Sequence, residues 1–213
     1  PHYDRVNSIL SFGLHYFWRK KLSCKIAPNQ KDLKILDCAT GTGEQLRSIM
    51  RYRPEISSLA GLDPSVSMLQ YAQKKMAAKN IHWTLGSMLD MPFPSENFDV
   101  VTLSFGIRNV ADPLKALQEI RRVLKKGGVL LLLEFSKPSH PLLLSLHTLY
   151  LRYWIPPIGF ILTRNREAYS YLSQTIDSFP YGEEFNALLK KAGFSSCSFT
   201  PLTGGIVTLY EGR

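Results

Sequence analysis

Cysteine, acidic side chains and uninterrupted apolar runs are all scarce in this 213-residue sequence. Its three cysteines, Cys24, Cys38 and Cys197, form neither a Cys-x-x-Cys pair nor a cluster with histidine. That spacing argues against a secreted disulfide scaffold and against a structural zinc site. We expect a protein of the reducing cytoplasm, without a signal peptide and without a metal.

The most apolar stretch, residues 141–162, is about long enough to cross a bilayer. It contains His147, Arg152 and the pair Pro156-Pro157. Because proline interrupts helical hydrogen bonding, the pair predicts a break in any helix there. We therefore expect a buried or membrane-surface segment and not a transmembrane helix.

Acidic residues are outnumbered, with 17 Asp and Glu against 26 Lys and Arg, and the net charge is +9. Residues 1–34 hold seven basic and two acidic side chains, whereas residues 35–136 hold twelve and ten. A solvated helix face, an anionic membrane surface and nucleic acid are the alternatives for such a basic segment. The sequence lacks a basic groove interleaved with aromatic residues, so we expect no nucleic-acid partner.

Strand-like and helix-like segments alternate through the middle of the chain. Apolar runs at 34–39, 58–63, 81–85, 98–105 and 129–135 alternate with helical patterns at 44–53, 64–78 and 113–126,. The last of these helices is expected to end at Gly127-Gly128. A helix at 183–192 precedes two strands at 194–200 and 205–211. The pattern predicts an α/β fold, a doubly wound sheet that binds ligands beyond the carboxyl ends of its strands.

A glycine-containing turn follows the first of these strands, with the sequence Asp37-Cys38-Ala39-Thr40-Gly41-Thr42-Gly43-Glu44. Asp63 ends the second strand and is placed to accept the hydroxyls of a ribose. Leu46 replaces the third glycine of a dinucleotide motif. The acids Asp37 and Glu44 would oppose a pyrophosphate but suit a ligand with positive groups. We therefore favour S-adenosylmethionine, which has a sulfonium and an ammonium group and no phosphate, over NAD.

Further segments along the chain carry a more specific pattern. They are Tyr3-Asp4-Arg5-Val6-Asn7 with Ser11, Gly13, His15 and Trp18, then Phe98-Asp99 with Ser104-Phe105-Gly106-Ile107-Arg108-Asn109-Val110, Leu133-Glu134-Phe135-Ser136-Lys137-Pro138, and Leu202-Thr203-Gly204-Gly205. With these segments the chain resembles, along essentially its whole length, the S-adenosylmethionine-dependent C-methyltransferases of quinone biosynthesis, the UbiE/MenG family.

The resemblance implies a Rossmann-like, seven-stranded, mostly parallel sheet whose last two strands form an antiparallel hairpin. It also implies a single methyltransferase domain over 1–213. Its parts are a helical N-terminal arm (1–32), a cofactor-binding half (33–136), a helical substrate cap (137–180), and a C-terminal helix with the hairpin (181–213).

The implied reaction moves a methyl group from S-adenosylmethionine to a ring carbon of a prenylated hydroquinone. The substrate is 2-demethylmenaquinol, which becomes menaquinol, or alternatively the benzoquinol of ubiquinone biosynthesis, or both. More remote alternatives are a nucleic-acid methyltransferase and a non-catalytic nucleoside-binding protein.

Candidate site residues come both from the glycine-containing turn and from the family resemblance. The turn contributes Asp37, Gly41 and Gly43, and the resemblance places further cofactor contacts on Thr42, Asp63, Ser87, Met88 and Ser104. Thr40 and Ser87-Met88 depart from the family, which commonly has Gly and Asn-Ala there. The catalytic candidates are Arg108 and Asn109, which follow the fourth strand, with His15 and Tyr3 from the arm.

Among the catalytic candidates, Arg108 is expected to stabilise a phenolate or to orient a water. It is a poor base, because the pKa of a guanidinium exceeds about 12. The basic arm and the apolar segment together supply charge attraction and apolar burial. We therefore expect peripheral association with the inner face of the cell membrane, and a homodimer remains open.

Overall fold

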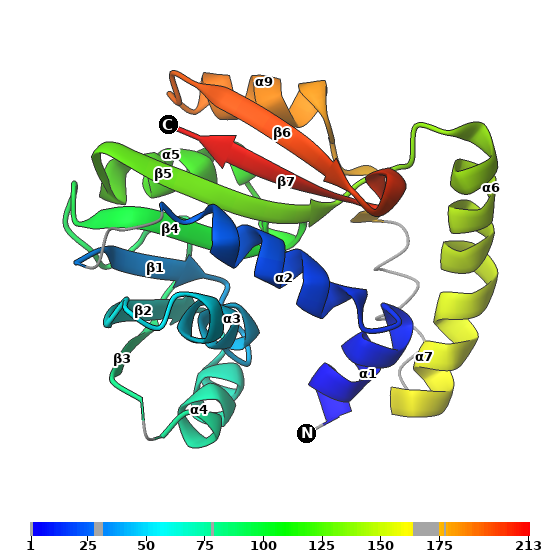
Figure 1. The fold of residues 1–213 in the computed structure, drawn as a ribbon, viewed down its shortest axis with the longest axis horizontal. Helices are drawn as coiled ribbons and strands as arrows, with labels where there is room; N and C mark the ends of the chain where they lie inside the picture. The colour runs from blue at the N-terminus through cyan, green and yellow to red at the C-terminus, as the bar shows by residue number, and fades with distance from the viewer. Residues whose placement is uncertain (1, 28–31, 78, 164–174, 177) are drawn as a thin grey trace.

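The computed structural model describes residues 2–27, 32–77, 79–163, 175–176 and 178–213. A seven-stranded sheet runs through it in the order β3-β2-β1-β4-β5-β7-β6 (Figure 1). Strands β1 to β5 pair in parallel, and β7 is antiparallel to both β5 and β6. The predicted doubly wound sheet with a terminal hairpin is confirmed. The strands are β1 Lys34–Cys38, β2 Ser58–Asp63, β3 Ile81–Leu85, β4 Phe98–Ser104, β5 Leu124–Phe135, β6 Cys197–Leu202 and β7 Val207–Gly212.

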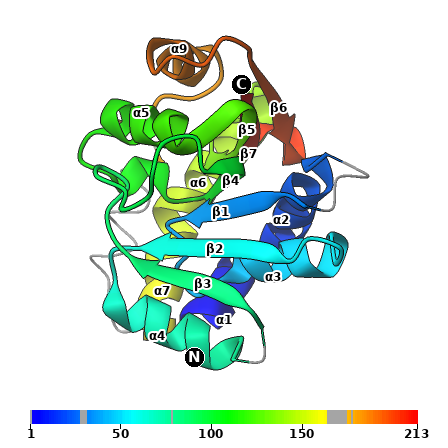
Figure 2. The same ribbon diagram turned by 90° about the vertical axis from the view of Figure 1, so that its left-hand side faces the viewer.

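Helices cover both faces of this sheet (Figures 1 and 2). Successive side chains of a strand point to opposite faces, and in β1 Ile35 belongs to one apolar cluster while Leu36 belongs to the other. The first cluster includes residues of α2, α3 and α4, and the second includes residues of α5 and α9. The bounds of these helices are α2 Leu14–Lys25, α3 Glu44–Tyr52, α4 Val66–Lys75, α5 Pro113–Val123 and α9 Glu183–Lys191.

The remaining helices lie beyond the carboxyl ends of the parallel strands, at the right of Figure 1. They are α1 His2–Leu10, α6 Pro141–Leu149, the π-helical turn η2 Tyr150–Trp154 and α7 Ile155–Thr163. Val6 and Leu10 of α1 share a buried apolar cluster with Leu151 and Ile155. The N-terminal helix therefore packs against the segment expected to cover the substrate. The rest of the expected cap, at 164–174 and 177, lies outside the described residues.

The helix predicted to end at Gly127-Gly128 ends earlier, at Val123, and that boundary is wrong. Leu124 already pairs with Phe98, and the register shifts before Val100 pairs with Val129. Gly127, with a φ of 76°, lies in this irregularity. The glycine therefore allows a bulge within β5 instead of ending a helix. In the hairpin, β6 and β7 begin two to three residues later than expected.

The predicted helix break at Pro156-Pro157 is also wrong. The two prolines occupy the first turn of α7, which follows α6 and the π-helical turn directly. Ile155 donates its backbone N–H to the carbonyl of Tyr150, five residues earlier. The π-helical turn η2 comes just before Pro156 and Pro157, which have no backbone N–H to donate. Because the wider turn accommodates them, α7 continues past both prolines,. Within the described part of the chain, no helix is both long and apolar enough to cross a membrane.

Candidate functional site

The turn after β1 has the backbone that a nearby ligand would require. Gly41 and Gly43 have φ values of 54° and 78°, in the left-handed region that favours glycine,. A Cβ at Gly43 would collide with the side chain of Met76, so this glycine permits close packing of α3. A Cβ at Gly41 would have its nearest neighbour, the carbonyl oxygen of Ala39, at 4.0 Å. Gly41 therefore has open space where a side chain would point.

Asp63 ends β2 beside this turn, as predicted. Its Oδ2 accepts the backbone N–H of Gly41 at 2.8 Å, and its Oδ1 accepts that of Ser65 at 2.9 Å. Only 7% of the residue is exposed. A carboxylate has about four lone-pair sites, so both oxygens keep capacity for ribose hydroxyls. The backbone N–H groups of Gly41 and Ser65 therefore fix the Asp63 carboxylate at the end of β2, next to the turn where a ligand would bind.

Asp37 is fully buried under the turn and has a different role from Asp63. Its two carboxylate oxygens accept the hydroxyls of Thr40 and Thr102, both at 2.7 Å. Burial raises the pKa of Asp37 to about 6, although these hydrogen bonds lower it. The side chain fixes the conformation of the turn from below, and its oxygens are already bonded within the protein.

The expectation that Glu44 presents negative charge to a cationic ligand is wrong. Its carboxylate accepts Arg47 Nη2 at 2.8 Å and forms an ion pair with Lys75 Nζ. These two bases neutralise the acid, and nothing in the sequence spacing indicates that the Lys75 side chain reaches it. The net charge beside this turn therefore depends on Glu44 together with the residues that pair with it, and not on Glu44 alone.

The other predicted cofactor residues differ in how they lie. Thr42 is buried and donates its hydroxyl to Asp4 at 2.7 Å. Ser104 ends β4 and donates its hydroxyl to Gln45 Oε1 at 3.1 Å. Ser87 is exposed, and its hydroxyl accepts the backbone N–H of Leu89. Met88 is 6% exposed and belongs to the apolar core, so only its backbone is placed to meet a ligand.

Arg108 lies just after β4 in the 3₁₀ turn η1 Ile107–Asn109. Its Nη1 donates to Glu134 Oε1 at 2.6 Å and to the carbonyl of Phe105 at 2.8 Å. The side chains of Arg108 and Glu134 are 9% and 2% exposed. The Nε of Arg108 is buried and has no hydrogen-bond partner among the described residues. A buried donor without a partner costs about 1–3 kcal/mol, so this atom is a candidate ligand contact.

Aromatic rings surround this guanidinium and the end of β4. Arg108 lies over the ring of Phe135, with 5.1 Å from the guanidinium carbon to the ring centroid. Phe105 and Phe135 have centroids 4.8 Å apart, and Trp18 from the arm packs against both. Phe105 has a φ of 62°, which is uncommon for a bulky residue and is the kind of strain found at functional sites,.

Among the described side chains, no hydrogen bond, ion pair or ring contact joins Asn109 or His15 to Arg108. Asn109 is exposed. His15 is 6% exposed, and its Nδ1 lies 2.7 Å from Ser11 Oγ. Burial, followed by the charge of Arg19, lowers the pKa of His15 to about 4, so the ring is neutral at pH 7. Tyr3 lies in α1, and its side chain lies outside the described residues.

Sequence reasoning missed several residues that hold the site together. Glu134 was visible as the one charged residue of the apolar run 129–135, and pairing with Arg108 explains it. Gln45 connects Ser104 to Ser23 of α2. Asp4 lies within a quoted motif, but its contact with Lys75 joins residues 71 positions apart. No local pattern signals a contact of that separation.

Comparisons with known proteins agree with this geometry. A model of the ubiE/COQ5 methyltransferase family matches residues 1–213. Curated relatives that carry the name ubiquinone/menaquinone biosynthesis C-methyltransferase UbiE match almost the whole chain, and three of them serve as examples. The one from Rickettsia bellii is 40% identical over 98% of this chain and 86% of its own length. Those from Campylobacter jejuni and Shewanella sp. (strain ANA-3) are 37% and 36% identical, over 99% of this chain and 92% and 85% of their own lengths.

Solved structures share the fold at lower identity. A chain in the complex between the Haloferax volcanii Trm112 methyltransferase activator and a putative methyltransferase has a TM-score of 0.69. It is 20% identical, and the match covers 98% of this chain and 93% of that one. A possible histamine N-methyltransferase from Thermotoga maritima has a TM-score of 0.67 at 19% identity, with coverage of 99% and 93%. At these identities, the likeness describes the fold alone.

Proposed function

The chain belongs to the ubiE/COQ5 methyltransferase family and is an S-adenosylmethionine-dependent C-methyltransferase; on that premise, we propose that it methylates a ring carbon of a prenylated hydroquinone. The substrate that we propose first is 2-demethylmenaquinol, which becomes menaquinol. The benzoquinol of ubiquinone biosynthesis is the second candidate, because the names of the relatives include both quinones.

The residues around the turn after β1 fit the methyl donor. Gly41 leaves open space next to its backbone, and the buried Asp63 carboxylate keeps lone pairs for ribose hydroxyls,. Ser104 ends the adjacent strand β4. When bound, S-adenosylmethionine supplies a methyl group on a positively charged sulfonium. We propose that Asp63 holds the ribose and that Gly41, Thr42, Gly43, Ser104 and the backbone at Ser87-Met88 line the rest of the site.

The single observation that carries the proposed substrate is the state of Arg108. Its guanidinium is buried, paired with Glu134 and stacked over Phe135, while its Nε–H lacks a partner among the described residues. A hydroquinone hydroxyl that has lost its proton offers an oxygen acceptor of opposite charge next to an aromatic ring. Charged donors fixed before reaction stabilise such an oxyanion without reorganisation. Arg108 is therefore proposed to bind the phenolate.

Methylation would form one carbon–carbon bond and break the methyl–sulfur bond of the donor, which would leave as a neutral thioether. The ring carbon–hydrogen bond would then break, and its proton would leave to solvent. Arg108 stays protonated and does not act as the base. Asn109, exposed in the same 3₁₀ turn, is proposed to orient the hydroxyl. The pKa of His15 is lowered to about 4, so its neutral ring is a weak base at pH 7, and we propose ring contact for His15 in place of proton transfer,. Tyr3 is proposed to contact the ring.

The substrate proposal is tested by presenting both ring types to the same enzyme. The protein is incubated with S-adenosylmethionine and either reduced demethylmenaquinone or a reduced demethyl benzoquinone, and initial rates are compared. We expect the naphthoquinol to gain the mass of one methylene at the higher kcat/KM. A higher value for the benzoquinol would reverse the order of the two candidates, and no gain on either would reject a quinol substrate.

The role of Arg108 is tested with a variant that preserves its charge. Arg108→Lys keeps the pair with Glu134 but removes the Nε–H and the planar fork. We expect kcat to fall at least about tenfold, the loss of one charged hydrogen bond of about 1.5–3 kcal/mol. S-adenosylmethionine affinity should stay unchanged. Arg51→Lys, an exposed arginine on α3, is the matched control. Full activity of Arg108→Lys would remove the phenolate contact from the mechanism.

We also propose that the enzyme meets its lipid substrate at an anionic membrane surface on the inner face of the cell membrane. Six large apolar residues on α6, η2 and α7 are 50–64% exposed, namely Leu142, Leu146, Leu149, Tyr153, Trp154 and Phe160. Phe12 at the tip of the arm is 78% exposed, and its ring lies 5.8 Å from that of Tyr150. The exposed Lys20 and Lys21 follow on α2. Apolar burial and charge attraction act together in such surface binding.

Vesicle sedimentation tests this surface. Anionic vesicles should retain the protein, and Trp154→Ser should weaken retention while leaving the fold intact. The control is Val66→Ser, at an exposed position on α4. Trp83→Ser is unsuitable as a control, because the Trp83 ring packs against Gly43 of the cofactor-binding turn. Equal retention by both variants would exclude the proposed surface.

A further inference from the structure

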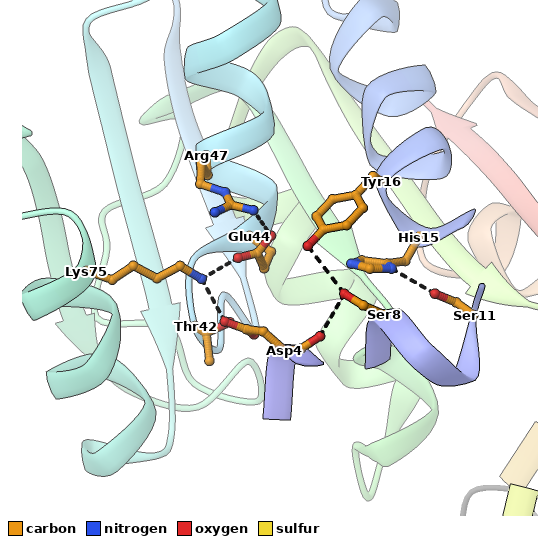
Figure 3. Close-up of polar contacts among 9 residues, drawn as sticks. All are labelled: Asp4, Ser8, Ser11, His15, Tyr16, Thr42, Glu44, Arg47 and Lys75. Atoms are coloured by element: carbon orange, nitrogen blue, oxygen red, sulfur yellow. Dashed lines mark hydrogen bonds and ion pairs between the residues drawn. The ribbon is translucent and has the colours of Figure 1, made fainter. Parts of the chain in front are cut away.

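Four charged side chains form one connected cluster beside the cofactor-binding turn (Figure 3). Asp4 Oδ2 accepts Lys75 Nζ at 2.7 Å, and Lys75 also pairs with Glu44. Glu44 in turn accepts Arg47. Two acids and two bases therefore balance, and three of the four are shielded, with side-chain exposures of 19% for Asp4, 19% for Lys75 and 8% for Glu44.

Asp4 is the member that comes from outside the cofactor-binding half. Its Oδ1 accepts the hydroxyl of Thr42, within the turn after β1, at 2.7 Å. Lys75 is the last residue of α4, the helix that follows Asp63 and β2. One carboxylate thus connects the two segments that flank the proposed ribose site. The other side of α1, at Val6 and Leu10, packs against Leu151 and Ile155 of the cap.

The ionisation of these groups supports a stable link at pH 7. Burial raises the pKa of Asp4, but the hydrogen bonds from Lys75 and Thr42 outweigh burial and leave it below its ordinary value. Burial lowers the pKa of Lys75, and the bonds to Asp4 and Glu44 outweigh it and leave the pKa raised. Both partners are charged. Removing the charge of Asp4 alone would therefore leave the cluster with one uncompensated positive charge.

We propose that Asp4 is a positioning residue that fastens α1 across the cofactor-binding turn and keeps the neighbouring Lys75 and Arg47 electrically balanced, so that no net positive charge opposes the cationic sulfonium of the methyl donor. The proposal rests on S-adenosylmethionine as methyl donor and is independent of the quinol. Methyl transfer converts the sulfonium to the thioether of S-adenosylhomocysteine. The two ligands therefore differ by one methyl group and one unit of charge.

The experiment measures the dissociation constants of both ligands by calorimetry. The variants are Asp4→Asn, Lys75→Gln and the double variant. Asp4→Asn should lower the preference for S-adenosylmethionine over S-adenosylhomocysteine at least about threefold, since charges near a protein surface interact in an effective dielectric constant of about 20. Lys75→Gln leaves the cluster negative and should raise that preference by a similar factor. The double variant should return it close to the wild-type value.

The matched control is Asp32→Asn, which removes an equal charge from an exposed position at the end of the arm. It should change neither affinity. A loss of affinity that is equal for both ligands in Asp4→Asn would mean a purely structural role and overturn the charge-balance proposal, as would an effect of Asp32→Asn of the same size. If Asp4→Asn does not fold, the rise in preference in Lys75→Gln decides alone, and its absence rejects the proposal.

Hydrogen exchange separates the fastening role from a general loss of structure. In the wild-type protein with S-adenosylhomocysteine, the backbone amides of α1 should exchange slowly. In Asp4→Asn they should exchange at least about tenfold faster, which corresponds to the loss of one charged hydrogen bond of about 1.5–3 kcal/mol, while amides of β1 and β4 stay unchanged. Unchanged exchange in α1 would show that Asp4 does not fasten the helix.

Discussion

Two regions of the molecule differ in the solvent exposure of their functional side chains. One is the cofactor-binding half, and the other is the surface formed by Phe12 at the arm tip together with α6, η2 and α7. In the first, the acids at the strand ends are buried and bonded, as Asp37, Asp63 and Glu134 show with exposures of 1%, 7% and 1%. In the second, large apolar side chains such as Phe12 and Trp154 stand in solvent at 78% and 63%.

This difference separates two requirements of the proposed reaction. Methyl transfer needs reacting atoms held close together in a defined geometry, and a fixed network of hydrogen bonds supplies that. A lipid substrate needs a surface that buries apolar area only when the membrane is present. The arm joins the two regions, because Asp4 bonds to the turn after β1 while Tyr150 donates its hydroxyl to the carbonyl of Leu10.

The largest expected effect of a single change is on the buried pair behind Arg108. Glu134→Ala leaves a buried guanidinium without its carboxylate, and we expect a loss of about 3–5 kcal/mol of unfolding free energy in urea titration. The double variant Arg108→Leu with Glu134→Leu should recover most of this stability but no methyl transfer. A loss under about 1 kcal/mol in Glu134→Ala would show that the pair is not buried as described.

A matched pair of leucines compares the two regions directly. Leu103 in β4 is fully buried and Leu142 on α6 is 64% exposed. Leu103→Ala should cost about 2–5 kcal/mol of stability, whereas Leu142→Ala should stay within about 0.5 kcal/mol. Similar losses at both positions would mean that the cap surface is covered in the folded protein.

The sequence predicted most of the fold of the cofactor-binding half, but little of the structure of the surface formed by the arm tip and α6 to α7. The apolar runs and the Asp63 strand end gave the sheet and its ligand-binding edge because period and spacing are local properties. The end of α5 was missed because Gly127 allows a bulge as readily as a helix end. The neutralisation of Glu44 by Lys75 was missed because their pairing depends on tertiary packing over 31 residues.

Asp63→Ala tests the prediction that the cofactor-binding half, and not the cap, sets cofactor affinity. Loss of the proposed ribose contacts should weaken S-adenosylmethionine binding at least about tenfold, as for one or two charged hydrogen bonds. Trp154→Ala should leave that affinity unchanged. Calorimetry of both variants makes the comparison, and a similar loss in Trp154→Ala would move part of the cofactor site into the cap.

The last effects concern pH and come from two buried groups, His15 of the arm and Asp37 of the cofactor-binding half. The pKa of His15 is lowered from 6.5 to about 4, so the unfolded chain binds its proton first and stability falls as pH falls through this window,. The pKa of Asp37 is raised from 3.8 to about 6, so its contribution is lost as pH rises through that window,. In urea titrations at decreasing pH, the unfolding free energy of His15→Gln should therefore fall less than that of the wild-type protein, and that of Asp37→Asn should fall more.

Identical slopes of unfolding free energy against pH in the wild-type protein and both variants would contradict these assignments. A change in the same direction for both variants would do so as well, because the two shifts have opposite signs.

The most direct measurement of the whole account is a single turnover with saturating S-adenosylmethionine and reduced demethylmenaquinone, followed by mass spectrometry of the quinol. The account predicts that wild-type enzyme adds one methyl group to a ring carbon. Arg108→Lys should bind the cofactor equally well and transfer the methyl group at least about tenfold more slowly. A quinol that gains no methyl group from the wild-type enzyme, or a variant that transfers at the wild-type rate, would contradict it.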